Sequence, residues 1–167
     1  TPVNKLVRVG LLHSRSGTMA LSENTVAEAE RLAIEDINAS GGVTINGQRV
    51  LIQPVEEDGM SDPDTFARQA EQLLDEQQVV AIFGGWTSAS RKAMLPVVEA
   101  KDALLFYPIS YEGQECSKNI FYTGAIPNQQ SEPATRFMLR RSPAAGKPFF
   151  LVGSDYVFPR TSHAITK

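Results

Sequence analysis

The stretch that most constrains the fold runs from Val79 to Ala93, where an apolar run, a glycine pair and a helix-like segment follow one another. Residues 79–83 are all apolar, which is typical of a strand buried on both faces of a parallel sheet. The glycines at 84–85 permit a tight turn, and the Thr-Ser pair at 87–88 can cap a helix over residues 89–95. A strand, a turn and a helix start are therefore predicted to meet at one point.

The turn in this stretch carries candidate ligand-binding residues. In an open α/β sheet, ligands bind at the carboxyl ends of the strands, where the free N–H groups of a helix start attract carbonyl or carboxylate oxygens. Trp86, the only tryptophan, lies there together with Thr87 and Ser88. The alternative is a plain connection between a strand and a helix, because most such turns bind no ligand.

Composition excludes several classes of function. The 167 residues include 42% hydrophobic and 21% charged residues, as expected for one globular domain with a core. A net charge of −3, with no basic run longer than a pair, argues against nucleic-acid binding. The single cysteine, Cys116, provides neither an internal disulfide nor metal-ligand spacing, and no metal or cofactor is predicted. No apolar run approaches the roughly 20 residues of a membrane helix.

Strand and helix patterns alternate along the chain and predict an α/β fold with a mostly parallel, doubly wound sheet. The last predicted strand and helix have no successor to cover them, so we expect the chain to be an N-terminal fragment of a longer protein. The strands are expected at 6–12, 50–55, 79–83, 103–106, 120–123 and 148–152, and the later helices near 133–141 and 160–167.

Local signals predict where several elements begin and end. Asn46-Gly47 is typical of a two-residue hairpin turn. Thr25 and Glu28 have the spacing of a capping box, although the first helix could also begin near Ser22. Asp62 is expected to cap a second helix that has Pro63 at its first position. Pro96 is expected to kink or split the third helix.

No enzyme is predicted, because the sequence lacks a nucleophile elbow, a P-loop and a dinucleotide-binding glycine motif. His13 and His163 are far apart in sequence, and a surface or loop position is the preferred interpretation of His13. The acids Glu56-Glu57-Asp58 could share a proton or hold a cation, but a solvated loop is the preferred interpretation.

A family resemblance comes from six segments taken in order. The chain resembles the urea and short-chain-amide branch of the type I periplasmic solute-binding proteins. The segments are GLLHSRSGTMA (10–20), INASGGV (37–43), GWTSASRKA (85–93), LFYPISYEG (105–113), NIFYTGAIPNQQ (119–130) and GSDYVFPRT (153–161).

The resemblance implies two Rossmann-like lobes with the ligand clamped between them. It implies that residues 1–124 form an incomplete first lobe, and that residues 125–167 form a crossover and the start of the second lobe. It assigns the ligand carbonyl to the backbone and hydroxyl of Ser88, and it places Tyr107 at the end of the next strand. Tyr156 matches an aromatic residue that closes from the second lobe.

The implied function is that of a receptor that captures urea or a short-chain amide and delivers it to an ABC permease from the periplasm. Urea would suit helix N–H groups, an aromatic ring and acceptors such as Asp155 or Glu112. Ser22 is also included among the candidate ligand residues. Alternatives are an amino-acid ligand, and a ligand-sensing domain of a signalling protein or cytoplasmic regulator. Association of copies through the incomplete second lobe is a further expectation.

Overall fold

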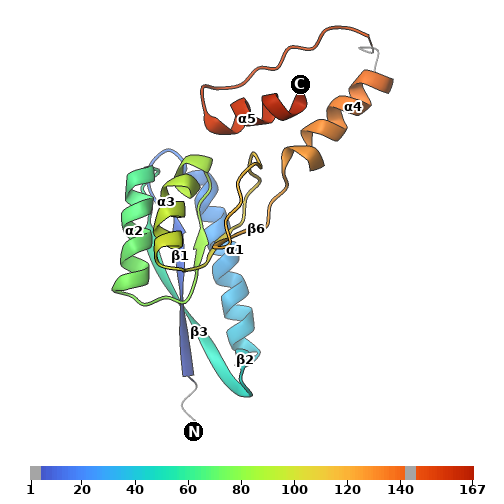
Figure 1. Cartoon of the computed structure of the whole chain (residues 1–167). Coiled ribbons are helices and arrows are strands. Elements are labelled where there is room, and N and C mark those ends of the chain that lie inside the picture. The colour runs from blue at the N-terminus through green and yellow to red at the C-terminus, as the bar shows by residue number, and fades with distance from the viewer. Residues whose placement is uncertain (1–4, 142–145) are drawn as a thin grey trace.

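The computed structural model describes residues 5–141 and 146–167, and its centre is a six-stranded sheet with the order β2-β3-β1-β4-β5-β6. All neighbouring strands are parallel except for the β2-β3 hairpin (Figure 1). The predicted fold class is therefore confirmed. The strands are β1 (Lys5–His13), β2 (Val43–Ile45), β3 (Gln48–Asp58), β4 (Ile82–Gly84), β5 (Leu105–Tyr107) and β6 (Ile120–Tyr122).

Helices cover both faces of the sheet. The helices are α1 (Ala20–Ala39), α2 (Pro63–Asp75), α3 (Ser88–Ala100), the short η1 (Pro127–Gln129), α4 (Ser131–Arg141) and α5 (Val157–Thr166). The main core lies between the sheet and α2 and α3, and a smaller cluster lies under α1. Alternation along β1 produces both clusters, because Leu11 faces α1 while Leu12 faces the main core.

Two local predictions are confirmed by the backbone. Asn46 and Gly47 have φ angles of 50° and 77°, the pair of positive values that a type I′ turn requires. Asp62 caps α2 by accepting a hydrogen bond from the Thr65 N–H at 2.8 Å, and Pro63 is the first helical residue. Both features depend on chemistry within a few residues, which a sequence displays directly.

Other boundaries differ from the expectations. The first helix begins at Ala20, before both predicted starts, and its cap residue Met19 makes no side-chain cap bond. Pro96 lies inside α3 without splitting it, and the alternative expectation of a kink stays a prediction. The strand expected at 79–83 is shorter and later, at Ile82–Gly84, although backbone hydrogen bonds to β1 already begin at the Val80 N–H, which donates to the Arg8 carbonyl oxygen at 2.9 Å.

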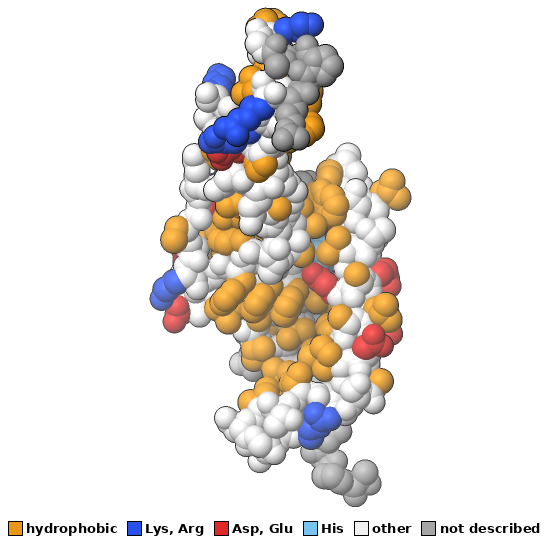
Figure 2. All heavy atoms as spheres, turned by 90° about the vertical axis from the view of Figure 1, so that its right-hand side faces the viewer, with side chains coloured by type: hydrophobic (Ala, Val, Ile, Leu, Met, Phe, Trp, Pro, Cys, Tyr) orange, Lys and Arg blue, Asp and Glu red, His pale blue; other side chains and the backbone are white. Residues whose placement is uncertain are grey.

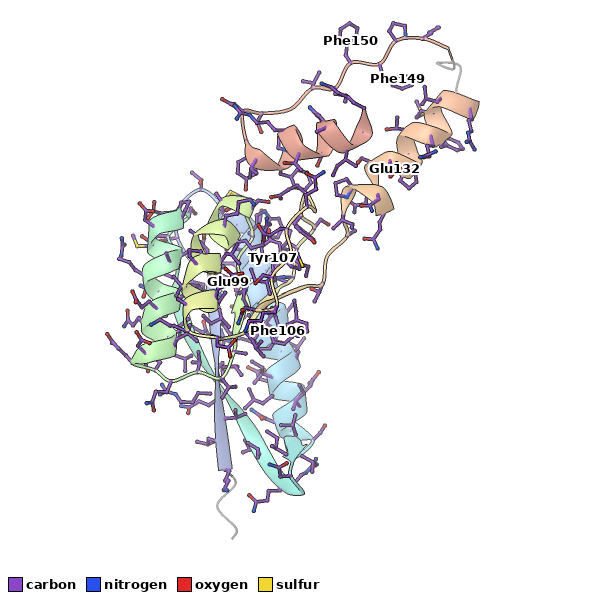
Figure 3. All side chains as sticks on the ribbon, in the orientation of Figure 1. Glu99, Phe106, Tyr107, Glu132, Phe149 and Phe150 are labelled. Atoms are coloured by element: carbon purple, nitrogen blue, oxygen red, sulfur yellow. The ribbon has the colours of Figure 1, made fainter. Side chains whose placement is uncertain are left out.

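The prediction of a strand at 148–152 is wrong. This segment is extended but pairs with no other strand in the part of the chain that the structure describes. Phe149 and Phe150 lie on the connection between α4 and α5, away from the sheet (Figure 3), and are 40% and 90% exposed. The acids 56–58 are also not in a loop, because they form the end of β3.

The sheet face that carries α1 is covered only in part. Phe83, Phe106 and Phe121, from three neighbouring strands, stack with ring centroids 4.7 and 4.8 Å apart. Phe121 is 49% exposed, and Figure 2 shows a band of apolar side chains across the middle of the molecule. The proposed division of the chain at 124 and 125 stays a prediction.

Candidate functional site

A cavity of about 410 Å³ opens at the carboxyl edge of the sheet, beside the start of α3. The strand order changes direction between β1 and β4, which is where open α/β sheets bind ligands. Loops after β1, β4 and β5 form one side, and the segment around Tyr156 forms the other. The lining residues are Met19, Trp86, Thr87, Ser88, Ile109, Ser110, Tyr156 and Phe158.

The first turn of α3 is held by its cap and by a hydrogen bond to Tyr156. Thr87 caps the helix, and its hydroxyl oxygen accepts from the Ser90 N–H at 3.0 Å. The N–H of Ala89 donates to the hydroxyl of Tyr156 at 3.0 Å. Gly84 permits the turn that precedes the helix, since its φ is 145° and a Cβ there would lie 2.0 Å from the Leu12 carbonyl oxygen.

Tyr107 supports this turn from below. Its side chain is fully buried, and its hydroxyl donates to the carbonyl oxygen of Trp86 at 2.5 Å. Burial raises the pKa of Tyr107 to about 12, against the opposing charge of Arg91. The expectation that Trp86, Ser88 and Tyr107 lie at one edge of the sheet is confirmed, and Figure 3 shows Tyr107 at the end nearest α5. Their roles in ligand binding stay a prediction.

A buried charge cluster lies directly beneath the start of α3. Arg91 is fully buried, and its guanidinium donates to Glu112 at 2.9 Å and to Glu115 at 2.8 Å. The rings of Tyr107 and Tyr111 lie 5.0 Å from the guanidinium carbon, and that of Tyr122 lies at 6.0 Å. Such contacts allow a guanidinium to be buried among aromatic rings.

The charges in this cluster compensate one another. Burial raises the pKa of Glu115, but hydrogen bonds from Arg91, Lys92 and Tyr122 outweigh it and lower the pKa to about 2. The sequence interpretation of Arg91-Lys92 as a solvated helix face is therefore wrong for Arg91. Glu115 lies 24 residues from Arg91 in the sequence, so no local spacing could reveal this pair.

Ser88 faces this cluster with its hydroxyl, which donates to Glu112 at 2.6 Å. Its side chain also lines the cavity, although only 3% of the residue is exposed. The proton of this hydroxyl is therefore engaged. At the helix start, the N–H groups of Ala89 and Ser90 are hydrogen-bonded, whereas that of Ser88 has no partner among the described contacts. Glu112, expected as a direct acceptor for ligand nitrogens, is 1% exposed and already hydrogen-bonded.

Three of the candidate residues lie outside the cavity lining, namely Tyr107, Ser22 and Asp155. Ser22 is in the first turn of α1, where its carbonyl oxygen accepts from the Thr25 hydroxyl at 2.6 Å. The side chain of Asp155 is 80% exposed and forms an ion pair with Arg160. The structure thus brings together Trp86, Thr87, Ser88 and Tyr156 at the cavity, with Tyr107 beneath them.

The interpretation of His13 as a surface or loop residue is wrong. His13 ends β1 and is 1% exposed, because α1 covers it. Its Nε2 lies 2.8 Å from a carboxylate oxygen of Glu30, and its Nδ1 lies 3.7 Å from Glu23. Burial lowers the pKa of His13, but the hydrogen bonds and charges of the two glutamates outweigh it and raise the pKa to about 9.

The sequence of the chain matches that of a known protein family. Residues 7–167 match the family model described as periplasmic binding protein domain. The chain belongs to this family. A Leu/Ile/Val-binding protein homolog 8 of Brucella abortus (strain 2308) is 27% identical over 139 residues, which are 83% of this chain and 30% of that protein. The chain thus spans about a third of the length of this curated relative.

Solved structures of periplasmic binding proteins share the fold. The substrate-binding protein of a branched-chain amino acid transporter from Streptococcus pneumoniae, in complex with isoleucine, has a TM-score of 0.71 at 23% identity, covering 82% of this chain and 39% of that chain. A solute-binding protein of an ABC transporter from Rhodopseudomonas palustris BisB5, in complex with 3,4-dihydroxybenzoic acid, has a TM-score of 0.78 at 20% identity, covering 96% and 42%. Both show the fold of this family.

Neither a metal centre nor a membrane-spanning helix is found among the described residues. Across residues 5–141 and 146–167, no three His, Cys, Asp or Glu side chains are grouped so that they could hold a metal ion. Within the same ranges, no helix is both long and apolar enough to cross a membrane.

Proposed function

We propose that this periplasmic binding protein chain is part of a solute receptor that captures a small neutral amide, such as urea or acetamide, and delivers it to an ABC permease from the periplasm. The family match and the fold support the receptor role. The choice of ligand class rests on the cavity beside α3.

The observation that carries the ligand class is the uncharged lining of this cavity. All eight described lining residues are apolar, aromatic or hydroxyl-bearing. An amino acid would bring an ammonium and a carboxylate, and burying either without a partner of opposite charge is costly. A small amide has a carbonyl oxygen for the α3 N–H groups and a flat face for an aromatic ring.

The charge cluster beneath the cavity supports the same conclusion. Arg91 is the cation nearest to Ser88 among the described contacts, and both Glu112 and Glu115 pair with it. The guanidinium is therefore not free to hold a ligand carboxylate. The solved relative from Rhodopseudomonas palustris BisB5 is in complex with a carboxylic acid, so the proposed preference separates this chain from it.

Calorimetric titration of the intact protein with urea, acetamide and leucine tests the proposal. We expect heat with urea or acetamide, without release of ammonia. Heat with leucine alone would reassign the ligand class, and ammonia release would indicate a hydrolase.

A pair of variants tests whether the cavity beside α3 is the site. Tyr107→Ala removes the donor that holds the Trp86 carbonyl, so the turn that lines the cavity loses its support and ligand binding should weaken. Glu57→Ala, on the half-exposed end of β3, is the control and should bind as the wild type does. Equal losses in the two variants would remove Tyr107 from the site.

A further inference from the structure

The hydroxyl of Ser88 has a fixed direction. A serine hydroxyl has one hydrogen to donate and two positions at which it can accept. Its oxygen lies 2.6 Å from Oε2 of Glu112, and an ionised carboxylate only accepts, so Ser88 is the donor. Nη1 of Arg91 donates to the same oxygen at 3.2 Å. One accepting position is left on Ser88 Oγ, and Ser88 is one of the residues that line the cavity.

The carboxylate of Glu112 is kept ionised by its surroundings. Burial raises the pKa of Glu112, but the hydrogen bond from Ser88 and the charge of Arg91 outweigh it and hold the pKa below its usual range. The ammonium of Lys92 lies 3.7 Å from the same carboxylate and acts in the same direction. Ser88 therefore keeps the donor role towards Glu112 at neutral pH.

The next N–H along the helix is already engaged. The N–H of Ala89 donates to the hydroxyl of Tyr156 at 3.0 Å, and Ala89 does not belong to the lining of this cavity. The acceptor on Ser88 complements a primary amide, which presents an N–H group beside its carbonyl oxygen. A carboxylate presents acceptors only and would leave Ser88 Oγ facing another acceptor.

We propose that Glu112 determines the ligand specificity of this site by accepting the Ser88 proton, which leaves Ser88 as an acceptor that favours an amide over a carboxylate. Glu112 acts through Ser88 and is itself 1% exposed. This inference rests on the proposed function, because it concerns the ligand of the same cavity.

The substitution Glu112→Gln reverses the direction of the Ser88 hydroxyl. Arg91 has no acceptor, so the oxygen of the glutamine amide must face Nη2 of Arg91, where Oε1 of Glu112 now lies. The NH₂ group then faces Ser88 and donates to it. With two donors directed at its oxygen, Ser88 turns its own hydrogen towards the cavity and suits a carboxylate.

Glu115 provides a matched control. Its carboxylate also pairs with Arg91, at 2.8 Å, and its side chain is 7% exposed. Its hydrogen-bond partners are Arg91, Lys92 and Tyr122, and Ser88 is not among those described. Glu115→Gln therefore removes the same charge from the cluster without changing the Ser88 hydroxyl.

The experiment measures the affinity of the intact protein for acetamide against acetate and for leucinamide against leucine, by calorimetry. We expect the wild type to prefer the amide in the pair that it binds. Glu112→Gln should reduce the ratio of amide to carboxylate affinity about tenfold, the effect of one hydrogen bond. Glu115→Gln should leave the ratio within about twofold, and Ser88→Ala should make it insensitive to Glu112→Gln.

Several results would overturn the inference. An equal change in the two glutamine variants would assign the effect to charge alone, and no change in either would exclude a role for Glu112. A wild type that prefers the carboxylate would contradict the assigned direction of Ser88. A wild type that binds neither pair would overturn the proposed function itself, and with it this inference. If Glu112→Gln unfolds, Ser88→Ala still decides, because it keeps the buried charges and must lose the amide preference.

Discussion

A buried histidine makes the stability of this domain depend on pH in a direction that can be derived. His13 lies under α1 between Glu23 and Glu30, and the charged form is favoured in the folded state. Its pKa rises from 6.5 to about 9 on folding. Protonated His13 therefore stabilises the fold fully below about pH 6.5, and this contribution is lost as the pH rises through about 9.

The substitution Glu30→Gln tests the interaction between His13 and Glu30. At about 1.36 kcal/mol for each pKa unit, the rise corresponds to roughly 3 kcal/mol, shared between the two glutamates. Both glutamates raise the pKa through a hydrogen bond and through their charge, so we assign about half of the effect, roughly 2 kcal/mol, to Glu30. The variant should lose this much stability at pH 6 and much less at pH 10, where His13 is neutral. Asp58, opposite His13 on β3, is present in the wild type and in the variant, so its charge does not contribute to the difference.

Unfolding by guanidinium chloride at pH 6, 8 and 10 provides the measurement, since urea is a candidate ligand. Glu28→Gln, on the exposed side of the same helix, is the matched control and should change stability by less than about 0.5 kcal/mol. NMR titration of the two histidines, with His163→Gln for assignment, reports the pKa of His13 directly. A pKa near 6.5, or an equal loss of stability at every pH, would refute the reasoning.

Two further predictions concern the turn and the charge cluster. Arg91→Met should destabilise the domain by about 3–5 kcal/mol in chemical unfolding, because it leaves two buried carboxylates without their cation. Gly84→Ala should cost more than about 2 kcal/mol in the same measurement, because alanine strains a φ of 145° and its Cβ would lie 2.0 Å from the Leu12 carbonyl oxygen. Wild-type stability in either variant would contradict the contacts described.

The parts of the fold that the sequence predicted are those decided by local chemistry. The Asn46-Gly47 turn and the Asp62 cap each depend on residues a few positions apart. The number of parallel strands up to β6 was also predictable, since each shows as a short apolar run. The start of α1 was not, because its capping-box residue Glu28 contacts Arg15 and Arg31 instead of the helix start.

The expected strand at 148–152 shows a limit of a different kind. Phe149 to Val152 have the composition of a strand, but a strand also needs a neighbour for its backbone hydrogen bonds. The described part of the chain provides none at that place. Composition can therefore predict that a segment tends to form a strand. Whether the strand forms depends on which other segments are present to pair with its backbone.

The sequence predicted several residues of the candidate site but not the hydrogen bonds between them. Trp86, Thr87 and Ser88 could be placed because a strand, a glycine turn and a helix start adjoin in the sequence. The cluster that gives Ser88 its direction could not, because Arg91 meets Glu112 and Glu115 from 21 and 24 residues away. Charged residues are usually solvated, so the local pattern favoured the wrong interpretation of Arg91.

The buried cluster also explains why the cavity lining is uncharged although α3, which begins beside the cavity, contains Arg91 and Lys92. Replacing a buried ion pair with apolar residues is often neutral or stabilising, so stability alone does not account for such a cluster. Its geometry suits positioning, since Glu112 joins the loop that carries Ile109 and Ser110 to the first turn of α3. One carboxylate thus joins the two segments that line the cavity and accepts the hydroxyl proton of Ser88. A single residue that fixes shape and polarity together is where we expect ligand preference in this chain to be decided.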